Sequence, residues 1–227
     1  MLAAWFPRAA RDPLHLAWGR VVLRPPRRRD WRAWAQLRAQ SRAFLVPWEP
    51  TWPEDALTRR AFRRRVQQYG FEQQSGSGYS FLIFRREDNV LVGGITVSNV
   101  RRGVAQAASL GYWIGQPHAR QGYMGEALSA VLDFAFDHLN LHRVEAACLP
   151  DNAASQGLLR KAGFTEEGYA RGYLRINGAW QDHVLFAILR DDPRGVEKPR
   201  LSRSRDIVPH PRRPHLRRQR PALRLHG

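Results

Sequence analysis

The sequence predicts an α+β fold (mixed α/β) in which a mostly antiparallel sheet contains one parallel β-α-β crossover. Several apolar runs of strand length are joined by short polar turns, which is typical of hairpins. Two of the runs, 107–114 and 142–149, are instead separated by a long amphipathic helix, and such a connection makes a right-handed parallel crossover. The 227 residues, 43% of them hydrophobic, are enough for one compact domain with its own core.

The first part of the chain predicts one short strand and two helices. A strand is expected at 21–24, before Pro25-Pro26, and Asp30 can cap a helix that covers 31–45. The Pro47–Pro50 segment breaks the chain, and a second helix is expected from about 54 to 71. For the outer face of that helix a solvated surface is slightly favoured over an anion-binding patch, although it carries Arg59, Arg60, Arg63, Arg64 and Arg65.

The second part predicts the sheet and the crossover. Strands are expected at 79–85 and 90–97, joined by a polar turn, and a short helix at 152–162 is expected to follow the crossover. The last two strands, 168–176 and 180–189, flank Asn177-Gly178, which is the strongest hairpin signal in the chain. The long helix has one apolar face, formed by Met124, Leu128, Val131, Leu132, Ala135 and Leu139.

The loop before the long helix is a candidate anion site. It contains Gly115, Gly122 and Gly125 between the strand and the helix start. The first backbone N–H groups of a helix have no partner within it, and the helix dipole favours negative charge there, so such a loop can hold a phosphate group. Taken alone, this strand–loop–helix pattern is a weak signal.

Composition restricts the class of protein. No run approaches a membrane span, the N-terminus lacks the apolar core of a signal peptide, and no His/Cys cluster has metal-ligand spacing, so neither a membrane role nor a metal is expected. The single cysteine, Cys148, is expected to be a buried inert thiol and is compatible with a reducing cytoplasm.

The positive charge is placed unevenly, and it suggests where the domain ends. The net charge is +17, and residues 194–227 carry eleven Lys and Arg against two acids. We therefore expect a peripheral segment at 1–20, one domain at 21–192 and a disordered Arg/Pro-rich tail at 193–227. The tail can hold polyanions such as RNA, or it can be an unselected basic extension, and composition favours neither.

Four stretches in order resemble a known family. They are PWEP at 47–50, GYWIGQPHARQGYMGEAL at 111–128, HRVEAACLPDNAASQGLLRKAGFTEEG at 142–168 and YLRINGAWQDHVLFAI at 173–188. Over about residues 21–191 the chain resembles the GNAT N-acetyltransferases, and among them the bacterial Rim-type ribosomal-protein-alanine N-terminal acetyltransferases. The resemblance implies a three-layer fold whose parallel crossover forms an acetyl-CoA cleft.

The resemblance also implies how acetyl-CoA binds. The family's pyrophosphate loop follows Gln/Arg-x-x-Gly-x-Gly/Ala, whereas this chain has Ala119-Arg120-Gln121-Gly122-Tyr123-Met124, so only the fourth position matches. Backbone donation by Gln121, Gly122, Tyr123, Met124 and Gly125 remains possible. The pantetheine arm is expected between the diverging strands 107–114 and 143–149.

The resemblance also implies that three residues after the crossover contact acetyl-CoA or take part in catalysis. Without the resemblance, Asn152 would be read as a helix cap, Ser155 as a surface residue and Glu167 as an ordinary strand-edge carboxylate. With it, Asn152 is expected to contact pantetheine. Ser155 is expected near the thioester sulfur as the acid, since Leu158-Leu159 replace the tyrosine that many GNAT enzymes use. Glu167 is expected to be the base, acting through water.

The acceptor is expected to be the N-terminal α-amine of a protein, and a ribosomal protein is the candidate. Loops at about 47–53, 71–79 and 170–183 would bind it, with Trp48, Tyr173 and His183 as contacts and His183 as the alternative base. An α-amine with a pKa near ~8 is already about one-tenth neutral at pH 7, so a mild base suffices. The alternatives are a small-molecule acetyltransferase acting on an aminoglycoside or polyamine, and a non-catalytic ribosome- or RNA-binding protein.

Overall fold

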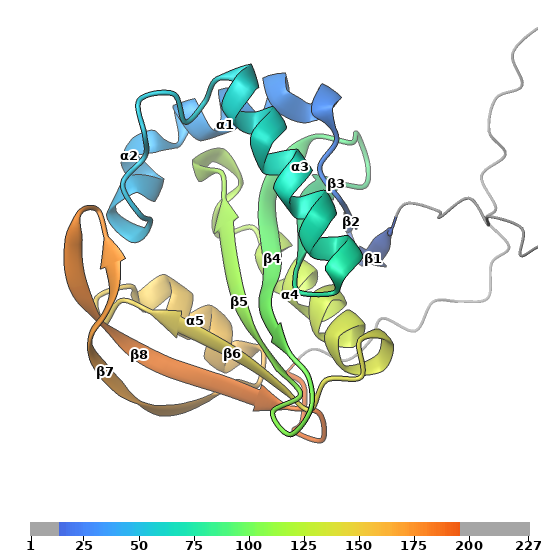
Figure 1. Cartoon of the computed structure of the whole chain (residues 1–227), viewed down its shortest axis with the longest axis vertical. Coiled ribbons are helices and arrows are strands. Elements are labelled where there is room, and N and C mark those ends of the chain that lie inside the picture. Colours follow the sequence, from blue (N-terminus) through green and yellow to red (C-terminus); the bar gives the residue numbers. More distant parts are fainter. Residues whose placement is uncertain (1–13, 196–227) are drawn as a thin grey trace, which may run out of the picture.

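The computed structural model describes residues 14–195 and contains one eight-stranded sheet with helices on both faces (Figure 1). The strand order is β1-β2-β3-β4-β5-β6-β8-β7, and β5–β6 is the parallel pair in an otherwise antiparallel sheet. The strands are β1 (Leu16–Trp18), β2 (Val21–Arg24), β3 (Tyr79–Arg85), β4 (Leu91–Arg101), β5 (Ala107–Ile114), β6 (Arg143–Cys148), β7 (Thr165–Ile176) and β8 (Ala179–Leu189). This confirms the predicted fold class.

Helices form the two outer layers. The α-helices are α1 (Trp31–Gln40), α2 (Arg42–Leu45), α3 (Arg59–Ser75), α4 (Tyr123–Asp133) and α5 (Ala153–Lys161). Short 3₁₀ turns lie at η1 (Arg28–Asp30), η2 (Val46–Trp48) and η3 (Gln116–His118), and one π-helical turn, η4 (Phe134–His138), extends α4.

Apolar side chains explain which helix covers which face. The apolar face of α4 is completely buried at Ala127, Leu128 and Val131, where it packs on the inner residues of the central strands. On the opposite face, Trp34 of α1 and Phe62 of α3 pack on the sheet with their ring centroids 4.9 Å apart. Burying an aromatic or leucine side chain of this size contributes about 1.5–3 kcal/mol, so these two layers account for much of the core.

The parallel pair β5–β6 stops halfway along its length. The two strands pair from Ala107–Arg143 to Leu110–Ala146 and share no further register, although both strands continue. Beyond that point β5 follows its antiparallel partner β4, and β6 follows β8. Figure 1 shows the two strands side by side at one end and diverging at the other. The two strands of the crossover therefore diverge, as the family resemblance implies, and we call the space between them the gap.

Two predicted helices differ from the structure because of contacts that sequence periodicity does not contain. The helix expected at 31–45 is interrupted at Ser41, which is completely buried and whose Oγ accepts from the backbone N–H of Gln116 at 2.9 Å. The helix expected from about 54 begins at Arg59, because Thr58 caps it by accepting from the N–H of Ala61.

Asp30 does not cap α1 with its side chain as expected. It forms a two-pronged ion pair with Arg24, at 2.7 and 2.8 Å, in which both residues are only 8% exposed. The guanidinium of Arg24 also lies over the Phe84 ring at 4.1 Å. A charge at this depth requires a partner, so Asp30 is held in place by β2.

The described part of the N-terminal segment is built into the sheet. Residues 14–20, expected to be peripheral, include β1 and the turn to β2. The preceding residues 1–13 and the predicted tail from 196 onward lie outside the described residues. Within the described range, no helix is long and apolar enough to cross a membrane.

The final hairpin confirms the Asn177-Gly178 turn and bends toward the helical layer. Both turn residues have positive φ, 43° and 85°, as a type I′ turn requires. A bulge interrupts the β7–β8 register between Ala170 and Leu174, and Asp182 closes it by accepting from the N–H of Gly172 and from the hydroxyl of Tyr169. These two bonds hold the pKa of Asp182 below its usual value.

The tip of the hairpin meets the loop after η2. The N–H of Asn177 donates to the backbone oxygen of Glu49 at 3.0 Å. We call this contact the bridge. It joins segments that are far apart in the sequence, and Figure 1 shows the hairpin rising to the end of α2.

Candidate active site

The loop before α4 presents a row of free backbone donors. Arg120 and Gly122 both have positive φ, 59° and 88°, which turns the chain sharply before the first helical turn. At Gly122 this conformation favours glycine, whereas at Arg120 it is a strained position of the kind found in functional loops. The N–H groups of residues 120–125 have no acceptor within the part of the chain that the structure describes. Such a concave turn at a helix start suits a phosphate group.

Arg20 anchors this loop from outside it. Its guanidinium donates to the backbone oxygen of Gln121 at 2.8 Å and to the carboxylate of Glu126 at 2.7 Å, and it lies over the Tyr123 ring at 4.8 Å. The backbone N–H of Arg20 also donates to Glu126. Glu126, the acid in the first turn of α4, is thereby paired, so its charge opposes an incoming anion less.

Two hydroxyl groups meet at the open end of the gap. Tyr112 lies two residues past the last paired residue of β5, and its hydroxyl is 2.7 Å from Oγ of Ser155 at the start of α5. Burial raises the pKa of Tyr112 to about 12. Both groups therefore keep their protons at neutral pH, and either can donate one to a group lying between the strands.

Cys148 lies beside these two hydroxyl groups, but no chemical role is expected for it. It is 6% exposed on β6, across the gap from β5, and it lies close to Ser155. Burial raises the pKa of its thiol. A protonated, enclosed thiol is a poor nucleophile, so the geometry agrees with the inert role expected from the sequence.

Asn152 is occupied as a helix cap. Its Oδ1 accepts from the N–H of Ser155 at 3.0 Å, so the oxygen fixes the first turn of α5. This cap aims Ser155 at Tyr112. The amide NH₂ of Asn152 and the second lone pair of Oδ1 remain for a ligand, and pantetheine contact by this side chain stays a prediction.

Glu167 is paired with Arg143. Its two carboxylate oxygens accept from the two terminal nitrogens of Arg143, one of them at 2.9 Å. That bond holds the pKa of the Glu167 carboxylate below its ordinary value. Glu167 lies at the point where the β7–β8 register shifts. Its neighbour Gly168 pairs with Leu185 of β8, and Leu185 pairs on its other side with Ala147 of β6, just inside the gap. The structure thus places the backbone of Glu167 near the gap and its carboxylate toward the paired end of β6.

The three expected acceptor contacts lie on the two segments that the bridge joins. Tyr173 and His183 come together on β7 and β8, with ring centroids 5.7 Å apart, and Trp48 lies on η2 next to the bridge. His183 is 3% exposed, and its Nδ1 lies 3.0 Å from the Gln181 backbone oxygen. Since a carbonyl can only accept, Nδ1 carries the hydrogen and Nε2 is the nitrogen with a lone pair.

A cluster around the buried Arg38, which the sequence did not reveal, supports the loop that contains Glu49. Both terminal nitrogens of Arg38 donate to Glu49, and Trp52 Nε1 donates to the same carboxylate at 2.7 Å. The Arg38 guanidinium also lies over the rings of Trp34, Trp52 and Trp113 at 5.6, 4.4 and 4.9 Å, respectively. We call Arg38 with these four partners the arginine cage. It fixes Glu49, whose backbone oxygen accepts the bridge.

Sequence reasoning missed Tyr112, Arg20 and the arginine cage. Tyr112 could have been found, because alternation along β5 puts it on the same face as Ala108 and Leu110, toward the long helix. Arg38 shares the buried helix face of Trp34 and Leu37, and a buried arginine implies a carboxylate partner. Within residues 14–195, no group of three or more His, Cys, Asp or Glu side chains could hold a metal ion.

Comparison with known proteins agrees with this geometry. The acetyltransferase (GNAT) domain matches residues 20–165. The [ribosomal protein uS5]-alanine N-acetyltransferase of Escherichia coli is 37% identical over 180 residues, which cover 79% of this chain and 92% of that protein.

Solved structures of similar proteins have the same fold. Mycobacterium smegmatis RimJ in complex with CoA-disulfide is 35% identical with a TM-score of 0.71, and the match covers 78% of this chain and 86% of that one. The ribosomal-protein-S5-alanine acetyltransferase from Vibrio fischeri is 29% identical with a TM-score of 0.73, covering 78% and 97%.

The arginine cage makes the bridge testable without any ligand. In Glu49→Gln the charged bonds to Arg38 are lost, and charge-assisted bonds of this kind contribute about 1.5–3 kcal/mol each. We expect the amide hydrogen of Asn177 to exchange at least tenfold faster, as measured by hydrogen–deuterium exchange. Glu54→Gln, a nearby exposed acid, is the matched control and should leave exchange unchanged. Unchanged exchange in Glu49→Gln would show that the bridge does not depend on the cage.

Proposed function

Since the chain belongs to the GNAT acetyltransferase family, we propose that it transfers the acetyl group of acetyl-CoA to the N-terminal α-amine of a protein, and that this protein is ribosomal. The enzyme class, an acyltransferase, follows from the family. The proposal extends it to the acceptor, and it places the reaction in the cytoplasm, where ribosomal proteins are made.

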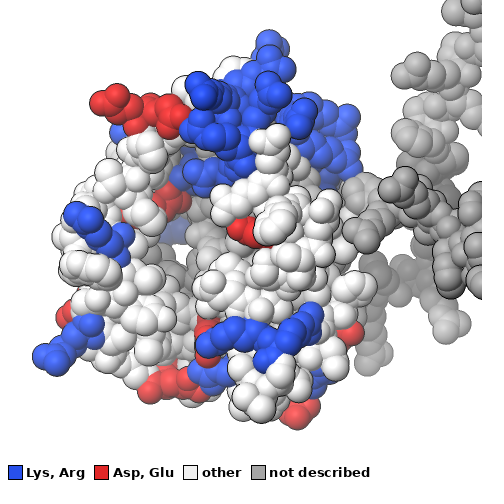
Figure 2. All heavy atoms as spheres, in the orientation of Figure 1, with Lys and Arg blue, Asp and Glu red and all other residues white. Residues whose placement is uncertain are grey.

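The enclosed shape of the acceptor opening carries this proposal. The bridge closes the space between the β7–β8 hairpin and the helical layer, and β5 and β6 form its other sides. Figure 2 shows a hollow in the surface at this place. A chain terminus can enter such an opening with its backbone, whereas a lysine in the middle of a folded surface can insert only its side chain while the backbone on both sides stays outside. The opening therefore favours a terminal amine.

The free donors of the α4 loop are proposed to hold the pyrophosphate of acetyl-CoA. The donors belong to Gln121, Gly122, Tyr123, Met124 and Gly125, and helix starts of this kind bind phosphate through backbone N–H groups. Arg120 is exposed beside them and adds a positive charge. The pantetheine arm then lies in the gap between β5 and β6, with Asn152 near its path.

The hydroxyl pair is proposed to serve the leaving thiol. A thiol with a pKa near ~8.5 needs only a weak proton donor when it leaves. Ser155 is in position to donate, and Tyr112 can replace that proton through the bond between the two hydroxyls. When bound, acetyl-CoA supplies the activated acyl group, and this chain's residues position it and supply the proton.

Glu167 is proposed as the base that accepts the amine proton through water. Its paired carboxylate is ionised at every working pH, since its pKa is lowered. A weak base of this kind suits an α-amine, about one-tenth of which is neutral at pH 7. His183 Nε2, beside Tyr173, is the alternative base.

Acetylation of peptides tests the acceptor. The full chain is incubated with acetyl-CoA and peptides that carry the N-termini of ribosomal proteins, with each peptide also supplied in an N-terminally blocked form that keeps its lysines. We expect acetylation of the free α-amines and none of the blocked peptides, as located by mass spectrometry. Gly122→Glu, which puts bulk and negative charge in the α4 loop, should abolish acetyl-CoA binding. Acetylation of aminoglycosides or polyamines, but of no α-amine, would contradict the proposal.

The hydroxyl pair predicts a loss of turnover without loss of cofactor binding. Ser155→Ala should lower kcat by about 10–100-fold, toward the low end of general acid effects because the thiol leaves easily, and leave KM for acetyl-CoA within threefold. Tyr112→Phe keeps the donor and should cost less. Ser80→Ala, a buried hydroxyl bonded to Thr96, is the control. A kcat as high in Ser155→Ala as in this control would remove Ser155 from the mechanism.

The Arg143–Glu167 pair predicts a change in the pH profile. Because Arg143 lowers the pKa of Glu167, the base is lost only as the pH falls through that lowered value. Arg143→Gln should let the pKa of Glu167 rise toward the ordinary value of a glutamate carboxyl group. The acid-side fall of log(kcat/KM) should therefore become steeper at a higher pH than in the parent chain.

Two glutamine variants separate the base from structure. Glu167→Gln should remove the steeper acid-side fall of log(kcat/KM). It should also lower kcat by a larger factor than it lowers the affinity for acetyl-CoA. Glu166→Gln, whose parent carboxylate pairs with Arg160, is the matched control and should do neither. If Glu167→Gln lowers affinity and turnover equally, the residue is structural.

A further inference from the structure

We propose that the outer surface of α3, η1 and the first turn of α1 is a docking surface for single-stranded RNA. The surface is formed by exposed arginines that the proposed reaction does not use, and we call it the arginine face. Its members are Arg28, Arg29, Arg32, Arg59, Arg60, Arg63 and Arg64.

The arginines of this face gather on adjoining elements. α3 is in contact with both η1 and α1, which brings the two groups of arginines together. Figure 2 shows them as one continuous positive area over the helical layer. Side chains of Arg59, Arg60, Arg63 and Arg64 also line a surface groove of ≈ 380 Å³ with Gln67.

Most of these guanidinium groups are available. Arg64 pairs with Asp55 at 2.6 Å. Among the described residues, the other members of the face have no carboxylate partner. Elsewhere in the domain the arginines that have such partners include Arg20, Arg24, Arg38 and Arg143. Unpaired guanidinium forks are well matched to phosphate oxygens, so this face differs from a solvated surface of mutually neutralised charges.

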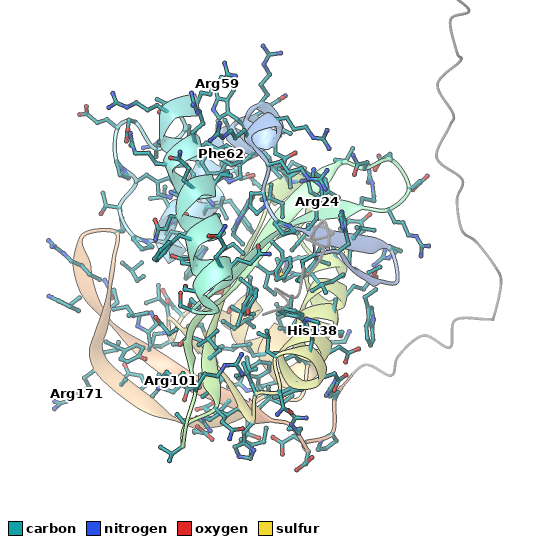
Figure 3. The ribbon with its side chains drawn as sticks, turned by 45° about the vertical axis from the view of Figure 1, so that its right-hand side comes forward. Arg24, Arg59, Phe62, Arg101, His138 and Arg171 are labelled. Carbon is teal, nitrogen blue, oxygen red and sulfur yellow. The ribbon has the colours of Figure 1, made fainter. Side chains whose placement is uncertain are left out.

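An aromatic ring continues the same stripe of α3. At 100° per residue, Arg60, Gln67 and Phe71 point in one direction, opposite the buried Phe62. Figure 3 shows Arg59 at the outer end of the helix and Phe62 directed toward the sheet. The Phe71 side chain is not part of the core, since the residue is 71% exposed. A ring next to a row of arginines can stack on an unpaired base while the arginines hold the backbone.

These features favour RNA over an anionic membrane. A helix that lies in a membrane surface needs a broad apolar face toward the lipid. In α3 the apolar residues Phe62 and Val66 face the protein, and Phe71 is the large apolar side chain on the outward stripe. The choice of RNA over single-stranded DNA rests on the proposed function, because a ribosomal acceptor would be found beside RNA.

The arginine face and the edge of the acceptor opening belong to the same helical layer. The chain runs from η1 through α1 and α2 to η2 and the bridge, so one helical layer carries both. Docking on RNA would therefore hold the opening close to a protein bound to the same RNA. We expect it to raise the local concentration of acceptor without altering the chemical step.

Binding of a labelled RNA of about 20 nucleotides with an unpaired segment tests the proposal, using the full chain over a range of salt. Each phosphate contact contributes roughly −0.7 to the slope of log K against log salt for a single strand. The variant Arg59→Gln/Arg60→Gln/Arg63→Gln should weaken binding at least tenfold and reduce the slope by about 2. Phe71→Ala should weaken binding by roughly tenfold with an unchanged slope, since stacking involves no counterion.

The matched control removes three arginines from the tail, Arg212→Gln/Arg213→Gln/Arg217→Gln, with the same change in charge. It should retain the parent affinity. If the tail variant loses RNA binding and the α3 variant does not, the proposal is wrong. Equal binding to anionic vesicles, or tighter binding to an acidic protein than to RNA, would also overturn it. Single-stranded DNA of the same sequence shows whether the sugar is read.

Acetylation of a free peptide keeps this proposal apart from the proposed function. The α3 variant should acetylate the peptide at the parent rate, because its three arginines are outside the acceptor opening. An α3 variant that binds RNA normally would contradict the docking surface, whatever the peptide assay shows. A chain that binds RNA through this face but acetylates no α-amine would contradict only the proposed acceptor.

Discussion

The early end of the β5–β6 ladder is the constraint on which the candidate site depends. Because β5 continues with β4 and β6 with β8, the two central strands must separate after Leu110 and Ala146. The separation leaves backbone groups facing a space instead of a neighbouring strand, which is tolerated in a sheet interior only if something else fills it. Tyr112, Cys148 and Ser155 surround that space, and the α4 loop lies at the end of the strand that leads into it.

Periodicity and turn chemistry predicted most of the fold. The crossover, the hairpins and the turn at Asn177-Gly178 depend on residues close together in the sequence, so local patterns reveal them. The break at Ser41 depends on Gln116, which is far away in the sequence, and no helical pattern of 31–45 contains it.

The same distinction explains which site residues could be anticipated. The α4 loop and the Asn152 cap are each formed by residues close together in the sequence. The loop was therefore predicted as a row of backbone donors, and Asn152 as the residue that caps a helix. The bond of Tyr112 to Ser155 depends on where a parallel ladder ends, and that of Glu167 to Arg143 depends on strand register. Both bonds depend on tertiary structure, so a sequence motif can identify the residue but cannot identify its partner.

The arginines illustrate how one residue type serves two purposes. A net charge of +17 was read from composition as a basic tail and a basic helix. The structure shows that Arg24 and Arg38 are buried, each bonded to a carboxylate and lying over aromatic rings, and so are part of the framework. Exposure and pairing, which counting cannot provide, separate them from the unpaired guanidinium groups on α3.

The bridge between Asn177 and Glu49 has a consequence for how such enzymes diversify. Both bonding atoms belong to the backbone, so the contact places no demand on the side chain of Asn177 beyond a left-handed conformation. Mutations on the hairpin and around the opening can therefore change which acceptors fit, while the frame around them persists. A lineage built on this frame can explore new acceptors by drift, one side chain at a time, without first losing its fold.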